Sequence, residues 1–265
     1  HCHYMNKLPA STGWTWLKNG ALLFRQQPAA LTTLLFANIL VSILISAVPV
    51  LGAMVAVVLI PSFSMAFMMA CSMIENGQRV TPAVALTGFR TPVLRELCKV
   101  GIVYLGVSLI LTLITRFAVQ PDFWEQVQAQ STSGTPAVLA GQDVLAMFLI
   151  FALDVVALIS LCFAAPLTYW QKMPPLKAVF YSFFAVKRSA GIFIVMLLAW
   201  FGIFFTVCMV IAVILGGSSI ARVVIMWVIF LFILLLQCAL YVGYREIFGK
   251  PPAEPGSKVS LDKQR

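Results

Sequence analysis

Charged residues are scarce in this sequence. Only 10% of its 265 residues are Asp, Glu, Lys or Arg, whereas 61% are hydrophobic. Soluble domains carry about 25% charged and about 45–50% apolar residues. A water-soluble fold of this size needs a polar surface that this composition cannot supply. The composition therefore argues against an ordinary soluble domain and predicts a membrane protein.

Residue types that carry enzyme chemistry are also missing. The two histidines are His1 and His3, so the rest of the chain offers no histidine as a general base or metal ligand. The sequence has no G-x-x-x-x-G-K-[ST] phosphate loop, and its six cysteines include no C-x-x-C pair. We therefore expect no enzyme activity, no cofactor and no metal site. The basic residues are dispersed along the chain, which argues against nucleic-acid binding.

Long apolar runs are abundant. Residues 26–74 contain no charge, which is enough for two spans of roughly 20 residues each. Hydropathy and turn residues predict an all-α membrane protein with six transmembrane helices. These lie near Ala29–Ala47, Val50–Ile74, Val100–Val119, Val144–Thr168, Ala190–Leu215 and Ser219–Tyr244. The spans form a membrane domain over residues 29–245, between an N-terminal segment (1–28) and a polar tail (246–265) whose composition is typical of disorder.

The basic residues predict the orientation. All eighteen Lys and Arg residues except Arg116 and Arg222 precede the first span, follow the last, or lie between spans two and three or four and five. The segment after the third span is instead acidic, with Asp122, Glu125 and Asp143. The positive-inside rule then places both termini in the cytoplasm of a multi-pass protein of the bacterial inner membrane.

Three short amphipathic segments each precede a pair of spans. They cover Trp14–Arg25, Pro82–Lys99 and Pro174–Arg188. The apolar stripes predicted for the first two are Trp14, Leu17, Ala21 and Phe24, and Leu86, Phe89, Val93 and Leu97. We expect these segments to lie in the cytoplasmic interface, with their basic residues near anionic lipid headgroups. The pattern fits three repeats of an interfacial helix plus two spans, although a shared environment alone could also produce it.

Asp154 is an acidic residue near the middle of the fourth span. A carboxylate in hydrocarbon is costly unless it is paired, hydrated or protonated. Arg116 on the third span lies at a matching depth, so we expect an interhelical pair between Asp154 and Arg116. The alternatives are a proton or cation site at Asp154, or a position that faces water.

Small residues on the second span predict close helix packing. Ser62, Ala66 and Ala70 are spaced four apart, which places them on one helix face. Packing within the chain is favoured over a homo-oligomer interface, which stays open. In the fourth span, Pro166 predicts a kink whose freed carbonyl is satisfied by a neighbouring helix.

The N-terminal segment carries a recognisable pattern. Gly13, Trp14 and Trp16 are followed by Leu23-Phe24-Arg25 and Pro28. This Gly-Trp-x-Trp…Leu-Phe-Arg-x-x-Pro signature resembles a family of uncharacterised bacterial inner-membrane proteins with six predicted spans. The resemblance implies the location and the fold but no activity, substrate or site residue.

Two functions follow as expectations. The first is a non-enzymatic membrane scaffold or lipid-interacting protein, whose partners are membrane lipids with anionic headgroups. The alternative is a small transporter or channel with Asp154 as a midplane proton or cation site.

Overall fold

The computed structural model describes residues 8–118 and 141–252, and every element within them is a helix. The elements are α1 (Thr12–Gln26), α2 (Pro28–Ser46), α3 (Leu51–Val58), α4 (Ile60–Glu75), the 3-10 helix η1 (Pro82–Phe89), α5 (Val93–Ala118), α7 (Gly141–Ser160), α8 (Ala164–Trp170), α9 (Pro175–Arg188), α10 (Ala190–Leu215) and α11 (Ser219–Phe248). The predicted acidic loop mostly lies outside the described residues, as does most of the predicted disordered tail (246–265). The prediction is wrong for the first residues of that tail, because α11 continues to Phe248.

The six predicted spans are confirmed. The described residues contain six helical segments that are long and apolar enough to cross a membrane. The fifth runs from Ala190 to Leu215, as predicted. The third begins earlier than expected, at Val93, because the last turn of the predicted interfacial segment continues directly into it. The second and fourth spans are each built from two consecutive helices, α3 with α4 and α7 with α8.

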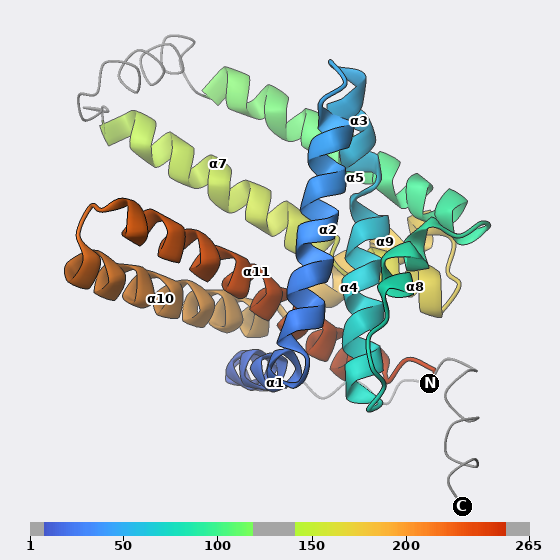
Figure 1. Cartoon of the computed structure of the whole chain (residues 1–265). Coiled ribbons are helices and arrows are strands. Elements are labelled where there is room, and N and C mark those ends of the chain that lie inside the picture. The colour runs from blue at the N-terminus through green and yellow to red at the C-terminus, as the bar shows by residue number, and fades with distance from the viewer. Residues whose placement is uncertain (1–7, 119–140, 253–265) are drawn as a thin grey trace, which may run out of the picture.

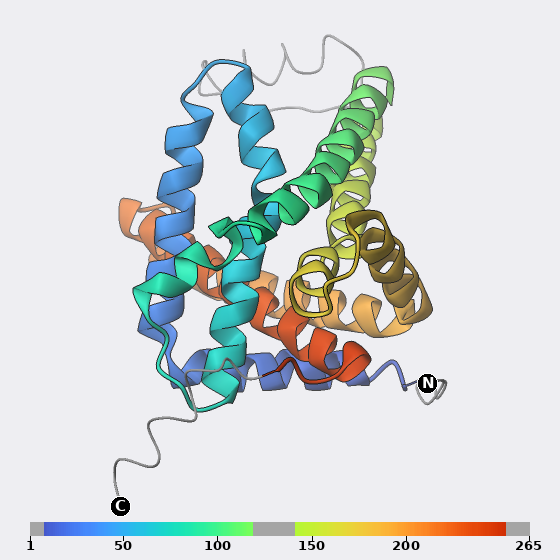
Figure 2. The same ribbon diagram turned by 90° about the vertical axis from the view of Figure 1, so that its right-hand side faces the viewer.

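The spans form three helical hairpins that diverge from a common base. The hairpins are α2 with α3 and α4, α5 with α7, and α10 with α11, and their tips point in different directions (Figures 1 and 2). At the base, α1 crosses α11 and α10 while α4 and α8 pack beside them. The main hydrophobic core lies at this junction, and its largest fully buried side chains include Trp16, Phe163, Tyr241 and Tyr244.

Helix α1 packs through a different face from the predicted one. Its buried positions are Thr12, Gly13, Trp16, Leu17, Gly20 and Leu23. Trp14, predicted to lie on the apolar stripe, is exposed. A Cβ atom at Gly20 would lie 2.6 Å from the backbone nitrogen of Ala239, so only glycine permits this crossing. Small residues such as Gly20 therefore determine which side of α1 faces the core, because they allow close approach to α11. Hydrophobicity alone does not predict this side.

The second predicted amphipathic helix, Pro82–Lys99, is not one helix. It divides into η1 and the first turns of α5, separated at Pro92. Proline lacks a backbone N–H and disfavours helical geometry in the residue before it, so a helix starts after Pro92 rather than passing through it. The predicted stripe is consequently wrong within η1, because Leu86 is exposed and Thr87 is buried. The third predicted segment is helical as α9, and the threefold repeat stays a prediction.

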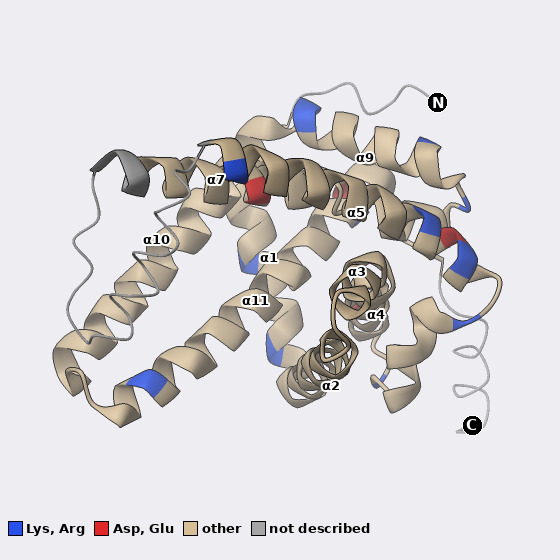
Figure 3. Ribbon diagram, turned by 90° about the horizontal axis from the view of Figure 1, so that it is seen from above, with Lys and Arg blue, Asp and Glu red and all other residues tan. Residues whose placement is uncertain are grey.

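Charged side chains concentrate at helix ends and connections. Figure 3 shows few coloured positions along the long helices, and α10 has none. This distribution is what a bilayer requires of spanning segments, because each charge in hydrocarbon is costly. The exceptions within spans include Asp154, which lies on α7.

Candidate functional site

The fourth span is broken at Leu161–Phe163, between α7 and α8. Pro166 lies one turn beyond the break. A proline ring displaces the carbonyl four residues earlier and supplies no N–H, so the helical hydrogen-bond ladder fails just before it. The kink predicted from Pro166 is therefore present, on its N-terminal side.

Neighbouring helices satisfy the backbone groups freed by this break. The Tyr104 hydroxyl on α5 donates to the carbonyl of Leu161 at 2.8 Å. The Ser182 hydroxyl on α9 accepts from the N–H of Phe163 at 3.1 Å and donates to the carbonyl of Ser160 at 2.8 Å. Because lipid offers no hydrogen bonds, these two side chains make the broken helix tolerable inside a membrane. The predicted partner was for the carbonyl four residues before Pro166, that of Cys162, and this part stays a prediction.

A cavity of about 300 Å³ lies between α5 and α7, directly beside the break. Its walls include Tyr104, Ser108, Thr112 and Thr115 from α5, and Asp154 from α7. The α5 residues are spaced four, four and three apart, so they form one polar stripe along the helix that faces the carboxylate. Asp154 itself is half-buried. The structure thus places the mid-span acid on the wall of a cavity that is lined by both hydroxyl groups and apolar side chains, rather than against lipid alone.

The hydroxyl groups of this stripe act mainly as acceptors toward the cavity. Thr112 donates to the carbonyl of Ser108, and Thr115 donates to the carbonyl of Leu111, both at 2.8 Å. Since Thr112 and Thr115 each use their single hydroxyl hydrogen within α5, only oxygen lone pairs of these two side chains remain for the cavity. A carboxylate with hydroxyl oxygens suits a proton or a monovalent cation.

The predicted pair of Asp154 with Arg116 lies on these same two helices. Thr115, the residue before Arg116, lines the cavity with Asp154, whereas the Arg116 side chain is exposed. Within the described ranges, ion pairs shorter than 4.0 Å join Lys99 to Glu96 and Arg245 to Glu75, and none joins Asp154 to Arg116. The described residues thus show no ion pair within 4.0 Å between these two side chains, and their pairing in the membrane stays a prediction.

The small-residue face of α4 is buried inside the single chain. Ser62, Ala66 and Ala70 are all fully buried. A Cβ atom at Gly88 of η1 would lie 2.6 Å from the carbonyl oxygen of Ser62, so η1 packs directly against the α4 backbone at this position. These contacts are intramolecular, which is the packing that the sequence favoured.

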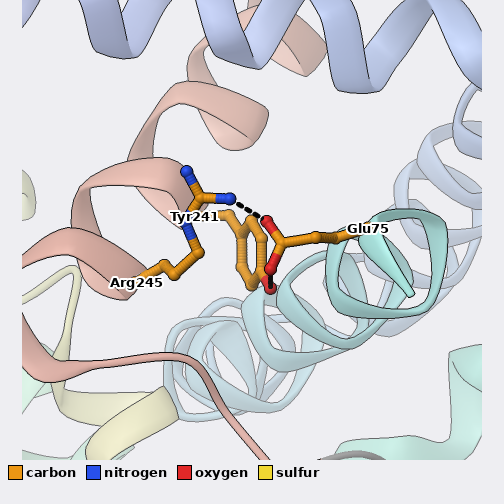
Figure 4. A network of polar contacts seen from close by, with 3 residues as sticks. All are labelled: Glu75, Tyr241 and Arg245. Atoms are coloured by element: carbon orange, nitrogen blue, oxygen red, sulfur yellow. Dashed lines mark hydrogen bonds and ion pairs between the residues drawn. The ribbon is translucent and has the colours of Figure 1, made fainter.

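A polar network at the base of the molecule was not foreseen. The Arg245 guanidinium on α11 donates to Glu75 at the end of α4, and the two form an ion pair (Figure 4). The Tyr241 hydroxyl donates to the other carboxylate oxygen of Glu75 at 3.3 Å. The Glu75 side chain is only 11% exposed, compared with 35% for Arg245. The network ties the second span to the last.

No partner for Glu75 was identified from the sequence. A usable signal existed, because Tyr241 and Arg245 are one helical turn apart and share a face of α11. The indole N–H of Trp16 also donates to Glu246, the next residue of α11. Both arrangements fix the position of α11 at the base.

Metal-binding clusters are not found in the described part of the chain. Over residues 8–118 and 141–252, no three His, Cys, Asp or Glu side chains lie where they could hold one ion. The buried cysteines Cys71, Cys162 and Cys238 are free thiols.

The comparison with known proteins agrees with this architecture. No protein-family profile and no solved structure matches the chain. The chain is 33% identical over 263 residues to a probable inner membrane protein of Burkholderia thailandensis, and the alignment covers 95% of each protein. With six membrane-spanning helices and this full-length similarity, the chain belongs to the family of that probable inner membrane protein and is itself a multi-pass protein of the inner membrane.

Proposed function

We propose that this protein is a non-enzymatic, lipid-interacting protein of the inner membrane, with both termini in the cytoplasm and α9 resting on the anionic cytoplasmic leaflet. The observation that carries the proposal is the outer face of α9. This helix buries only Ala178 and Ser182 against the bundle. It exposes 68% of Leu176 and 61% of Phe180, with Phe183 and Phe184 also exposed.

The chemistry of α9 suits an interface rather than the bilayer core. Fourteen residues are too few to span a membrane. Lys177 lies 5.6 Å from the centre of the Tyr181 ring, and Lys187 is exposed in the last turn. An exposed aromatic face with lysines beside it is typical of a helix that lies in the headgroup region, where basic side chains meet lipid phosphates.

Lipid-dependent stability tests this function. Adding phosphatidylglycerol to the protein in a neutral detergent should raise its Tm, because the anionic lipid binds the folded state. The double variant Lys177→Gln, Lys187→Gln should lose much of that rise. Arg116→Gln, Arg222→Gln removes two exposed basic residues from outside the predicted cytoplasmic segments and should retain it. An equal loss in both doubles would show non-specific charge attraction and reject a role for α9.

A second function, a small transporter or channel, is favoured by the cavity at Asp154. Its acceptor-rich wall beside a broken helix has the features of an intramembrane ion site. In proteoliposomes, an entrapped pH-sensitive dye or a sodium indicator would report flux driven by an imposed gradient.

Substitutions separate this function from the structural pair. Asp154→Asn should abolish a cation-dependent flux while leaving Tm unchanged if Asp154 is an ion site, and Arg116→Gln should leave the flux intact. A salt bridge instead predicts that each substitution lowers Tm and that the double variant is not additive. Absence of flux in the wild-type protein would reject the transport function.

A further inference from the structure

A second cavity lies within the spanning region, between α2, α4 and α11. It has a volume of about 640 Å³, which is in the usual range for small-molecule sites of roughly 300–1,000 Å³. Asn38, Ser42 and Ser46 line it from α2 at intervals of four residues, and Ser64 and Gln237 face them from α4 and α11. The remaining walls are mostly apolar and include Phe63 and Phe67.

Two side-chain atoms of residues that line this cavity are buried and have no partner in the protein. Asn38 is only 9% exposed, and its amide nitrogen Nδ2 is buried without an acceptor. The amide oxygen Oε1 of Gln237 is likewise buried without a donor. Asn38 lies near the middle of α2, where lipid can satisfy neither atom. Leaving such groups unsatisfied is costly, so the arrangement calls for a ligand with complementary groups.

The charge and shape of the cavity restrict that ligand. None of the lining residues is charged, so a phosphate or an ammonium group would find no counter-ion there. The unpartnered amide nitrogen needs an acceptor, and the unpartnered amide oxygen needs a donor. One hydroxyl group can serve as both. Ile43, on the cavity wall, is itself largely exposed on the outside of α2, so the cavity is open on the side that faces hydrocarbon.

We propose that the α2–α4–α11 cavity binds an uncharged, hydroxyl-bearing lipid of the diacylglycerol class. The free hydroxyl bonds with Asn38 and Gln237, the neighbouring serines face the ester groups, and the acyl chains extend along the apolar walls into the bilayer. This inference rests on the proposed lipid-interacting function, but it concerns a different site and a neutral rather than an anionic lipid.

The test measures binding of radiolabelled dioleoylglycerol to the purified full-length protein in detergent micelles. Wild-type protein should bind it saturably. Asn38→Leu and Gln237→Leu should each weaken binding about tenfold, as expected for the loss of one buried hydrogen bond. Thr206→Val removes a hydroxyl from the lipid-exposed part of α10 and should leave binding unchanged. O-acetylated dioleoylglycerol, which lacks the donor, should compete about tenfold less well than the free alcohol.

A stability measurement excludes the main structural explanation. If the two amides instead bond to each other or to a buried water in the free protein, each substitution to leucine should lower Tm in lipid-free detergent, with a non-additive double variant. The ligand site predicts no loss of Tm from Asn38→Leu, because an unpartnered group is removed. Lowered Tm with non-additivity would overturn the proposal. So would wild-type affinity in both leucine variants, or an acetylated lipid that competes as well as the free alcohol. The rise in Tm with phosphatidylglycerol, which depends on α9, tests the proposed function in a separate experiment. The proposed function and the diacylglycerol site can therefore each fail without the other.

Discussion

The ion pair of Glu75 with Arg245 predicts an asymmetric response to mutation. Arg245→Met removes the guanidinium and leaves a carboxylate that is only 11% exposed, with the Tyr241 hydroxyl as its remaining partner. Removing one partner of a buried pair costs about 3–5 kcal/mol. Because Arg245 is 35% exposed, water reaches part of the site, and we expect the lower end of that range, about 3 kcal/mol.

The reverse substitution should cost much less. Glu75→Gln leaves an arginine that is one-third exposed and can be hydrated, and the new amide can still accept a hydrogen bond from Tyr241. We expect a loss of about 1 kcal/mol. The double variant Glu75→Gln, Arg245→Met should be more stable than Arg245→Met alone, because the unpaired carboxylate is gone.

Thermal unfolding in detergent, followed by tryptophan fluorescence, measures these differences. At about 2–4 °C per kcal/mol, Arg245→Met should lower Tm by about 6–12 °C and Glu75→Gln by about 2–4 °C. Arg222→Gln, at an exposed position on the other end of α11, is the control and should have little effect. Equal losses from both single variants, or additive losses in the double variant, would refute the argument from burial.

Three further predictions concern α1 and the topology. Gly20→Leu should lower Tm strongly, because even a Cβ atom there meets the α11 backbone, whereas Lys18→Leu on the exposed side should not. Trp16→Phe keeps the aromatic ring but removes the indole donor to α11, and should lower Tm by a few degrees in the same assay. In intact cells, a cysteine introduced at Gly217 should react with a membrane-impermeant thiol reagent and one at Lys250 should not. Labelling of Lys250→Cys alone would reverse the proposed orientation.

Much of the fold could be predicted from the sequence because the free-energy cost of placing a charge in lipid depends on its position within one span and not on how the spans pack. The uncharged run over residues 26–74 requires two spans wherever the rest of the chain lies. The turn at Gly216-Gly217-Ser218 and the break before Pro166 follow from the backbone preferences of glycine and proline. Asp154 was recognisable as a candidate site for the same reason, since a mid-span carboxylate is costly in any arrangement of helices.

Only the tertiary structure determined which side chains and backbone groups contact one another between helices. Hydropathy ranks the two faces of α1 by apolarity, whereas the structure selects the face on which Gly20 permits contact with the α11 backbone. The pairing of Glu75 with Arg245 joins residues 170 positions apart, and the cavity that holds Asn38 and Gln237 needs three helices at once. Sequence periodicity describes one helix at a time. Steric fit and hydrogen-bond partners between helices depend on how the hairpins pack, which no single segment specifies.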